Sequence, residues 1–474
     1  MNNKMKRRGD KLNILLINPV VPNKFKIFDY CDEKGKRAIK KRVLIGPPLA
    51  LNELAGIIPE ENVYIVDMQE ESNLNPNYDF EEELKILINE FRPDIVGITC
   101  LTAQFNNVTK MINIIKEVSE DIFCIIGGVH ASSAPRDFLI TKADVLCIGL
   151  GKHSFYHLVS KFKDKGFYAD FLSVPGIALI KDGDLVYSKS LCEISYKDFM
   201  DEYFLGNILP NRTLTDRYQY LIPDVNKRIH YLCTSMGCPS KCNFCYLWKM
   251  TNGKFFHKSI DDIIAELKTM NNYFVIRFAD ANTFGDLKKA RELFQRIIDE
   301  GLNKNHIFMG DVRCDTVINN RDLIELAVKA GLRLVVCGLE ATSDEELKNY
   351  GKGSGVQEII DGLHILNEMG IKVNGNYIVR PDYDIKDFDR LKKFIMNNPI
   401  HNTALTILTP FPGTEQWDEL YDQIVIKDYD YFNLTNCVLK SKLPEDEFYN
   451  QIANVYEYIE ETGKVYEERY GKFE

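Results

Sequence analysis

The strongest constraint on the fold is an alternation of short apolar strands with amphipathic helices, which occurs twice along the chain. In the first series the strand patterns lie at residues 12–19, 62–68, 94–100, 122–128 and 143–149, with helix patterns between them at residues 47–58, 79–93 and 106–119. Strands of this kind that alternate with helices predict a parallel, doubly wound sheet. A hairpin is predicted to follow at residues 176–189, with Asp182 and Gly183 at its turn.

The second series consists of six strand patterns, which lie at residues 229–234, 273–280, 306–313, 333–340, 372–380 and 403–410. Six strand–helix units predict a partial α/β barrel, whose ligand site lies at the carboxyl ends of the strands. Polar residues occur at several of these ends, among them Asp280, Arg313, Glu340 and Arg380. We therefore expect these side chains to surround a single mouth.

The chain of 474 residues is too long for one hydrophobic core. We predict a disordered lead at residues 1–11, a doubly wound domain at 12–190, a linker at 191–228, the barrel at 229–419 and a helical carboxyl-terminal region at 420–474. The sequence contains neither an apolar run of the ~20 residues that span a bilayer nor a signal-peptide pattern, so we expect a cytoplasmic protein without a transmembrane segment. Its net charge of −10 disfavours a large nucleic-acid surface, and we expect no nucleic-acid partner.

Three of the twelve cysteines form a compact group in the loop after the first strand of the second series. Cys238, Cys242 and Cys245 follow the pattern C-x3-C-x2-C, and the residues between them include the polar types Ser, Lys and Asn. Thiolates bind zinc, copper or iron–sulfur clusters. A cubane cluster held by three cysteines leaves one iron for a small molecule, as a catalytic site requires.

A zinc-binding interaction protein without catalytic activity is the alternative from another class. A structural zinc ion needs four ligands, and Cys233, His230 and His257 are candidates for the fourth. The cysteines that lie singly in apolar strands are expected to be ordinary buried side chains, namely Cys100, Cys124, Cys147 and Cys337.

The order of the motifs resembles the cobalamin-dependent class of the radical S-adenosylmethionine (SAM) superfamily, which carries an amino-terminal B12-binding domain. The motifs that carry the resemblance are LLINP, PPLALNELAGII, PDIVGITCLTAQFNN, IIGGVHASSAP and ADVLCIGLG in the first half, and TSMGCPSKCNFC, RFADANTF, DVRCD, CGLEA and TPFPGT in the second. The resemblance implies a Rossmann-like B12-binding domain followed by a radical SAM (β/α)6 partial barrel. It also implies a 4Fe-4S cluster on Cys238, Cys242 and Cys245, SAM on the open iron, and cobalamin.

The resemblance assigns further binding residues. For SAM they are Phe244, Asp280, Arg313 and Glu340. For cobalamin, at the strand ends of the first domain, they are Gln69, Thr99, Thr102, Gly127, Gly128, Val129, His130, Gly149 and Gly151. No catalytic residue is assigned.

The chain departs from the family pattern at three places. Gln69 stands where many B12 domains carry the histidine that ligates cobalt, so we expect cobalt to lack that ligand. Lys152 replaces an acidic residue of the family. The sequence VRPDYD at 379–384 replaces the usual Gly-x-Pro-Gly-Glu turn, which makes Arg380 a candidate contact for an anionic substrate, although a surface role is equally compatible.

The activity that the resemblance implies most directly is methyl transfer to an unactivated carbon. A 5′-deoxyadenosyl radical would abstract a hydrogen atom, and methylcobalamin would deliver the methyl group. The alternatives are a B12-dependent rearrangement or ring-forming enzyme, and a radical SAM enzyme whose B12 domain does not bind cobalamin. The expected partners are an external one-electron reductant of the flavodoxin or ferredoxin type and a small-molecule or peptide substrate.

Overall fold

The computed structural model describes residues 11–33, 36, 39, 46–189, 208–222 and 226–470. The predicted lead at residues 1–11 lies outside the described residues except for Lys11. The chain forms two compact units: the first runs to Asn23 and includes Pro47–Gln219 and Met250–Asn252, and the second comprises Lys24–Gly46, Tyr220–Lys249 and the chain from Gly253 onward.

The first unit contains a seven-stranded sheet in the order β2-β1-β3-β4-β5-β6-β7. Its parallel strands are β1 (Asn13–Asn18), β2 (Asn62–Asp67), β3 (Ile95–Thr99), β4 (Phe123–Gly127) and β5 (Val145–Cys147). β6 (Ile177–Lys181) and β7 (Asp184–Tyr187) add the predicted antiparallel hairpin, with Asp182 and Gly183 at positive φ in its turn. This topology confirms the predicted parallel sheet.

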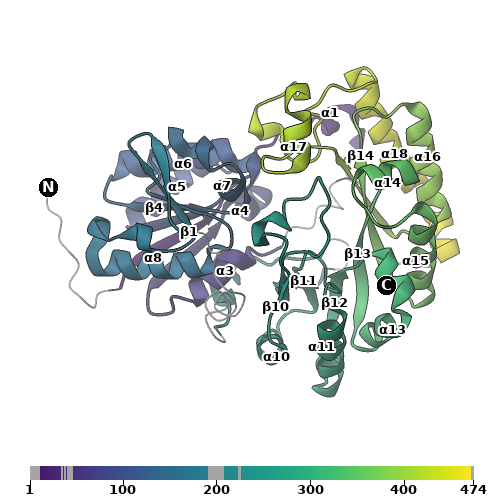
Figure 1. The fold of residues 1–474 in the computed structure, drawn as a ribbon, viewed down its shortest axis with the longest axis horizontal. Coiled ribbons are helices and arrows are strands. Elements are labelled where there is room, and N and C mark those ends of the chain that lie inside the picture. The colour runs from purple at the N-terminus through teal and green to yellow at the C-terminus, as the bar shows by residue number, and fades with distance from the viewer. Residues whose placement is uncertain are drawn as a thin grey trace. The chain divides into compact units, whose positions relative to one another are not determined.

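Helices cover the first sheet, as seen in the purple and blue part of Figure 1. They include α3 (Leu49–Gly56), α4 (Met68–Leu74), α5 (Phe80–Phe91), α6 (Phe105–Val118), α7 (Val129–Ser133) and α8 (Gly151–Lys165). Neighbouring strand residues point to opposite faces of a sheet, and Leu15 and Leu16 in β1 are both 0% exposed. Both faces are therefore covered, as a doubly wound sheet requires.

Residues 208–219 belong to the first unit, whereas the sequence predicted a linker over 191–228. The side-chain amide of Asn52 donates to the Asn211 carbonyl at 2.9 Å and to Thr215 Oγ1 at 3.0 Å. The Tyr218 hydroxyl donates to Glu71 Oε1 at 2.9 Å. Buried polar groups anchor this segment. Because its sequence has only weak apolar periodicity, its membership of the first unit was not predicted. Residues 191–207 of the predicted linker lie outside the described residues.

The second unit contains six parallel strands in the order β15-β14-β13-β12-β11-β8. The strands are β8 (Ile229–Leu232), β11 (Val275–Phe278), β12 (Ile307–Asp311), β13 (Leu332–Glu340), β14 (Lys372–Val379) and β15 (Asn402–Ile407). Their spatial order follows the sequence order, as a barrel that does not close requires. The prediction of six strand–helix units in a partial barrel is confirmed.

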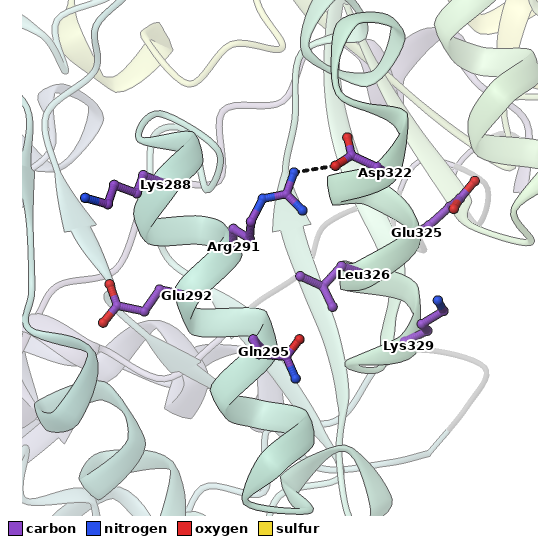
Figure 2. A pocket seen from close by; sticks show the side chains of 8 residues that line it. All are labelled: Lys288, Arg291, Glu292, Gln295, Asp322, Glu325, Leu326 and Lys329. Carbon is purple, nitrogen blue, oxygen red and sulfur yellow. Dashed lines mark hydrogen bonds and ion pairs between the residues drawn. The ribbon is translucent and has the colours of Figure 1, made fainter.

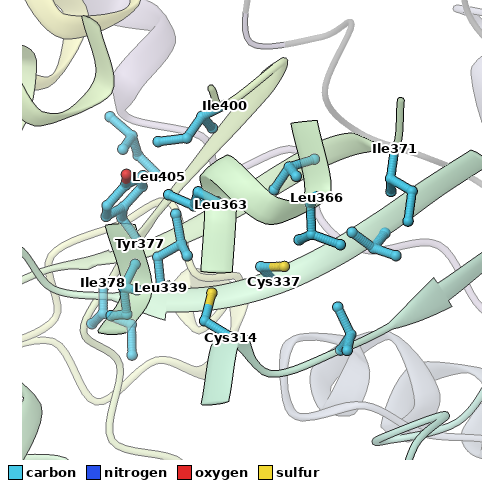
Figure 3. Close-up of a cluster of buried hydrophobic side chains, with 14 of the residues drawn as sticks. Cys314, Cys337, Leu339, Leu363, Leu366, Ile371, Tyr377, Ile378, Ile400 and Leu405 are labelled. Carbon is cyan, nitrogen blue, oxygen red and sulfur yellow. The ribbon is translucent and has the colours of Figure 1, made fainter. Parts of the chain in front are cut away.

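Helices pack on one face of this second sheet (Figure 1). They include α10 (Ile260–Lys268), α11 (Leu287–Asp299), α12 (Cys314–Asn319), α13 (Arg321–Lys329), α14 (Asp344–Asn349), α15 (Val356–Glu368) and α16 (Ile385–Asn397). Ser259 accepts a hydrogen bond from the Asp262 amide at 3.1 Å and so forms the predicted cap of α10. Figure 3 shows part of the apolar cluster between sheet and helices, with Cys337 and Leu339 from β13 and Leu363 and Leu366 from α15.

Two terminal segments complete the second unit. α18 (Glu445–Tyr470) lies in the predicted helical carboxyl-terminal region at 420–474, and its Phe448 joins the main core. α17 (Glu415–Leu420) begins earlier, within the range predicted as barrel. Residues 24–33, which the sequence placed in the first domain, also lie here, because the Tyr30 ring stacks on Tyr449 at 5.1 Å and Lys26 donates to Asn436. Such contacts join positions more than 400 residues apart, so no local pattern predicts them. None of the helices in the described ranges is long and apolar enough to cross a membrane.

Candidate cluster and cofactor site

The cysteine loop follows the carboxyl end of β8. Two short antiparallel strands, β9 (Ser235–Met236) and β10 (Phe256–His257), pair at its base and close it. Gly237, at φ +83, begins the loop in a conformation that favours glycine. Cys238, Cys242 and Cys245 are therefore held together at one end of the second sheet.

Asp280, after β11, fixes the entry to this loop. Its carboxylate accepts hydrogen bonds from the Thr234 amide at 2.8 Å, the Thr234 hydroxyl at 2.7 Å and the Ser235 amide at 2.9 Å. Burial raises the pKa of Asp280, and these hydrogen bonds oppose that rise. Asp280, which the resemblance assigned to SAM, thus holds residues 234 and 235 in place.

The three loop cysteines are free thiols in a partly buried place. Burial raises the pKa of Cys245 to about 11, while a hydrogen bond from the Leu247 amide lowers it. Burial also raises the pKa of Cys242, and the positive charges of Lys352 and Arg313 counteract this effect. Binding to iron would remove the cost of burying thiolates, so the loop fits a metal cluster.

The three candidates for a fourth zinc ligand have other contacts. Across the described residues, no three His, Cys, Asp or Glu side chains converge on a point suited to a single metal ion. His230 Nδ1 accepts from the Tyr231 amide at 2.8 Å, His257 Nδ1 lies 2.7 Å from the Lys258 carbonyl, and Cys233 donates to the Ser235 carbonyl. A cubane cluster needs no such convergence, because each cysteine binds a different iron.

Charged residues gather beside the cysteine loop. Glu340, at the end of β13, pairs with Lys352 Nζ at 3.0 Å, and both side chains are nearly buried. Arg313 donates to Asp315 and reaches Ser240 Oγ in the loop at 3.5 Å. The structure thus brings the predicted Arg313 and Glu340 to the loop and adds Lys352, which lies in the short GKGSG turn where no sequence motif marked it.

Phe244 lies within the cysteine loop. Its ring packs edge-on against Tyr350 with centroids 5.4 Å apart. The buried Tyr350, which caps the carboxyl end of α14 (Asp344–Asn349), was not predicted as part of the site. The contact shows that the loop is packed against the elements that follow β13.

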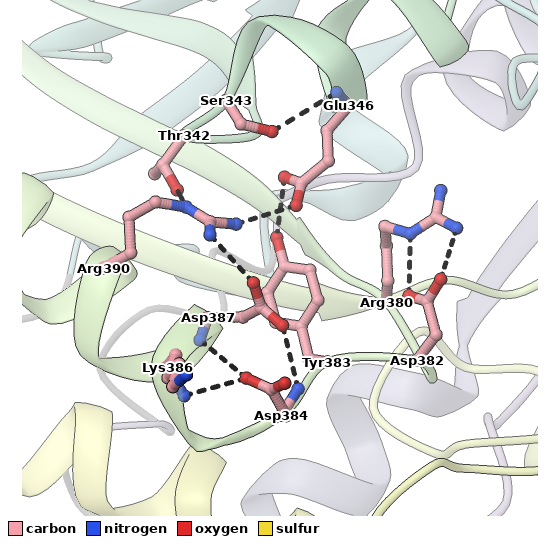
Figure 4. Close-up of polar contacts among 10 residues, drawn as sticks. All are labelled: Thr342, Ser343, Glu346, Arg380, Asp382, Tyr383, Asp384, Lys386, Asp387 and Arg390. Atoms are coloured by element: carbon pink, nitrogen blue, oxygen red, sulfur yellow. Dashed lines mark hydrogen bonds and ion pairs between the residues drawn. The ribbon is translucent and has the colours of Figure 1, made fainter.

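The altered turn after β14 is held by its own ion pairs (Figure 4). Arg380 donates to both oxygens of Asp382, at 2.8 and 2.7 Å. The Tyr383 hydroxyl donates to Glu346 at 3.0 Å, and Arg390 donates to the same carboxylate at 2.8 Å. Arg380, the candidate contact for an anionic substrate, therefore already has a bidentate partner within the turn.

The glycines at the strand ends of the first sheet fall into two groups. Gly128 has φ +98, and a Cβ there would lie 2.7 Å from the Cys100 amide nitrogen, so the backbone itself requires glycine. At Gly127, Gly149 and Gly151 the nearest atoms to a Cβ would lie 3.7, 3.9 and 3.7 Å away. These three leave bare backbone that a bound cobalamin would fit.

Several predicted cobalamin contacts have other tasks in the first unit. Gln69 accepts from the Val21 amide at 2.8 Å and donates to Asn73, which ties the loop after β1 to α4. His130 is 0% exposed, and its Nε2 lies 3.3 Å from Asp137. Its ring packs between those of Phe105 and Phe138.

The position of His130 has a local cause. α7 begins at Val129, immediately after Gly128, so the chain turns and directs the following side chain into the core. Thr102 is buried in the turn after β3, whereas Thr99 is half-buried at the end of β3, close to Gly128. Of the predicted polar side chains, Thr99 is the better placed for a ligand at the strand ends.

A surface groove lies away from the cysteine loop, between α11 and α13 on the helical side of the second sheet (Figure 2). Charges of both signs line it, and the ion pair of Arg291 with Asp322 bridges the two helices. Lys288 and Lys329 also contribute to its walls. None of the described residues that line the groove is a predicted site residue.

Comparison with known proteins agrees with this arrangement. The family model of the radical SAM superfamily matches residues 232–395, and that of the B12 binding domain matches residues 35–159. The hopanoid C-3 methylase of Methylococcus capsulatus is 26% identical over 411 residues, which cover 84% of this chain and 73% of that protein. The anaerobic magnesium-protoporphyrin IX monomethyl ester cyclase of Cereibacter sphaeroides is 24% identical over 386 residues, or 80% of this chain and 62% of that protein.

A solved structure shows the same fold. TsrM from Kitasatospora setae, a radical SAM methyltransferase whose structure contains cobalamin and a 4Fe-4S cluster, superposes with a TM-score of 0.65 at 15% sequence identity. The similarity covers 88% of this chain and 76% of that one.

The matches and the cysteine loop define a radical SAM enzyme. Because a B12-binding domain precedes its barrel, the chain belongs to the cobalamin-dependent radical SAM enzymes, as its motifs indicated. This family implies three bound groups: a 4Fe-4S cluster, SAM and cobalamin.

Proposed function

We propose that this protein transfers a methyl group to an unactivated carbon of its substrate. The observation that carries the proposal is the pairing of a B12-binding domain with a three-cysteine loop at the strand ends of a partial barrel. Its similarity to a C-methylase over 84% of the chain supports the same reaction. When bound, the cluster with SAM supplies hydrogen-atom abstraction, and cobalamin carries the methyl group.

The chain's own residues hold the cluster and tune its surroundings. Cys238, Cys242 and Cys245 supply three thiolates, and the Leu247 amide stabilises negative charge on the last of them. Lys352 and Arg313 place positive charge beside Cys242. The resulting site favours an electron-rich cluster and an anionic group of SAM.

The predicted SAM contacts follow from these positions. We assign Arg313 and Glu340 to the polar groups of SAM, since one is cationic, the other is anionic, and both adjoin the loop. Phe244 packs against Tyr350 and so fixes the part of the loop next to Cys245. Asp280 acts indirectly, by holding the strand end from which the loop departs.

Cobalamin is assigned to the strand ends of the first unit. Gly127, Gly149 and Gly151 supply the bare backbone, and Thr99 supplies a hydroxyl. Gln69 is engaged by Val21 and Asn73, so we expect no protein ligand to cobalt from that position.

The reaction needs two partners outside the chain. We propose a small-molecule or peptide substrate and an external one-electron reductant of the flavodoxin or ferredoxin type, because each turnover of a radical SAM enzyme consumes an electron. The site of both partners is the cluster end of the second unit.

Anaerobic purification and reconstitution test this function. We expect iron and sulfide in the ratio of a 4Fe-4S cluster, together with one cobalamin per chain. With SAM that carries an isotopic methyl label, the product of a methyltransferase contains the label, and S-adenosylhomocysteine forms in equal amount to 5′-deoxyadenosine. A chain that assembles no cluster with all three cysteines intact contradicts the proposal.

Ring formation is a second candidate, because a cyclase aligns with 80% of the chain. The same labelling experiment separates the two reactions. A cyclase yields 5′-deoxyadenosine, an unlabelled product and no S-adenosylhomocysteine.

A further inference from the structure

The two faces of the second sheet differ in chemistry. The residues that face the helices are apolar and form the cluster of Figure 3, to which Ile276, Phe308, Cys337, Val373 and Leu405 contribute. Side chains alternate along a strand, so the residues between these point to the opposite face. That opposite set contains Arg277, Asp311, Asn374, Asn376, Asn402 and Thr406, which we call the polar face.

A parallel sheet that is covered on both sides is apolar on both faces. The polar residues of the polar face are instead half-buried. Along β14 and β15 they alternate with buried residues, most of which point to the helices. Val275 and Leu334, which lie on this face near the amino ends of β11 and β13, are buried. Arg277 and Asp311 lie nearer the carboxyl ends of β11 and β12, the end that carries the cysteine loop.

The strand register brings three of these polar residues beside β13, one on one side and two on the other. Asp311 pairs with Val336, and Val336 pairs with Asn374. Gly338, the next residue of β13 on this face, pairs with Asn376. β13 then ends at Glu340 beside the cysteine loop, four residues or about 13 Å beyond Val336. The distance from these polar groups to the cluster end is therefore within the length of a small molecule.

Several side-chain N–H groups on this face form no hydrogen bond to the residues that the structure describes. Arg277 Nη2 lies 2.9 and 3.3 Å from the two Asp311 oxygens, but within the described chain its Nε and Nη1 donate to no protein group. The side-chain amides of Asn374 and Asn376 likewise form no hydrogen bond to any described residue. Partly buried donors of this kind favour a ligand that supplies acceptors.

Burial of the Asp311 carboxylate beside Arg277 carries a desolvation cost. Burial raises the pKa of Asp311 to about 6, against the lowering effect of Arg277. An anion from a ligand would share the guanidinium, which has donors for two acceptor groups at once.

We propose that the polar face recognises the substrate of the proposed methyl transfer, on which this inference rests. Arg277 binds an anionic group, a carboxylate or a phosphate, and Asn374 and Asn376 bind neighbouring amide or hydroxyl groups. The substrate is thus a polar, anionic molecule, in contrast to an apolar polycyclic lipid. The two sources of negative charge are separated by the experiment.

The test measures binding of four small probes to the full-length holoenzyme by calorimetry. The probes are N-acetylglycine, which has an amide and a carboxylate; N-acetylglycinamide, which lacks the charge; glycerol 3-phosphate; and the apolar alcohol cyclohexylmethanol. We expect one anionic probe to bind about tenfold more tightly than N-acetylglycinamide, and cyclohexylmethanol to bind most weakly. Which anionic probe is preferred identifies carboxylate or phosphate.

Variants locate the binding. Arg277→Met should remove the preference for the anionic probe, and Arg277→Lys should retain part of it. Asn376→Leu should weaken both N-acetyl probes about fivefold. Arg291→Met is the matched control, because Arg291 also pairs with an aspartate but lies on the helical side of the sheet, and it should change nothing.

The inference is overturned if cyclohexylmethanol binds as tightly as the anionic probes, or if Arg291→Met and Arg277→Met have equal effects. Iron, sulfide and cobalamin are measured on the same samples. A loaded enzyme without probe preference overturns only the substrate class. A sample that selects the anionic probe through Arg277 but never assembles a cluster supports the polar face and overturns the proposed methyl transfer.

Discussion

The two parallel sheets of this protein differ in what they leave accessible. In β1, Leu15 and Leu16 point to opposite faces and both are 0% exposed, so the first sheet offers ligands only its strand ends. In β14, buried residues alternate with Asn374 and Asn376, so the second sheet offers a face as well as an edge. The same strand–helix unit thus makes an edge site when helices cover both faces, and a larger site when they cover one.

The largest effect is expected from the cysteines. Cys242→Ala removes one iron ligand at the strand ends of the second sheet, so the rate of 5′-deoxyadenosine formation should fall by at least about 10³-fold. Cys337→Ala, in the apolar cluster behind the same sheet, should cost stability but leave the iron content unchanged. Iron analysis and product quantification check both variants. Normal turnover by Cys242→Ala would show that the cluster lies elsewhere.

The second prediction concerns the faces themselves. Leu16→Ala opens a cavity inside the first sheet and should lower the free energy of unfolding by about 2–5 kcal/mol. Asn376→Ala, on the polar face of the second sheet, removes no protein hydrogen bond and should cost less than about 1 kcal/mol. Urea unfolding followed by circular dichroism measures both. Equal losses would mean that the polar face is packed as tightly as the first sheet.

The periodic elements were predictable and the isolated anchors were not. Apolar runs, of which LNILLINP in the first sheet is one, predicted the strands of both sheets, because burial on one or both faces leaves a repeating pattern. Residues 208–219 and 24–33 escaped prediction, because single hydrogen bonds and ring contacts hold them to distant parts of the chain.

The candidate site shows the same division. Cys238, Cys242 and Cys245 are recognisable because one loop carries them all at a fixed spacing. Lys352 pairs with Glu340 across a turn, and Arg277 of β11 pairs with Asp311 of the neighbouring β12. Neither pair has a recognisable sequence motif. The inward turn of His130 depends on where α7 begins, and residue identity alone gives no sign of it.

A third prediction uses the acidic group of the polar face. Asp311 keeps its proton up to about pH 6 in the folded protein, whereas an unfolded aspartate ionises near pH 4. The folded state therefore binds more protons in this window, and its stability from this residue falls by up to about 3 kcal/mol as the pH rises from 4 to 6. Asp311→Asn should remove that part of the pH dependence.

Unfolding of wild type and Asp311→Asn in urea at pH 4, 5, 6 and 7 gives the difference directly. The variant should gain stability relative to wild type as the pH rises, and the gain should level off above pH 6. Asp322→Asn is the control, since Asp322 is exposed and its pKa is lowered by its bond to Arg291. A parallel shift of Asp311→Asn at all four pH values would mean that Asp311 is already ionised at pH 4.

The smallest effect is expected at the edge of the first sheet, where two adjacent glycines differ. A Cβ at Gly127 would meet its nearest neighbour at 3.7 Å, so Gly127→Ala should leave stability within about 0.5 kcal/mol of wild type. The added methyl group would occupy the space assigned to cobalamin, and affinity for cobalamin should fall a few-fold. Gly128→Ala, at φ +98 and 2.7 Å from backbone, should instead destabilise the fold by about 1–3 kcal/mol. Titration with hydroxocobalamin followed by absorbance, alongside urea unfolding, separates the two effects. Unchanged affinity in Gly127→Ala would place the corrin or its tail away from β4. The strand ends of the first sheet would then not be the cobalamin site at that strand.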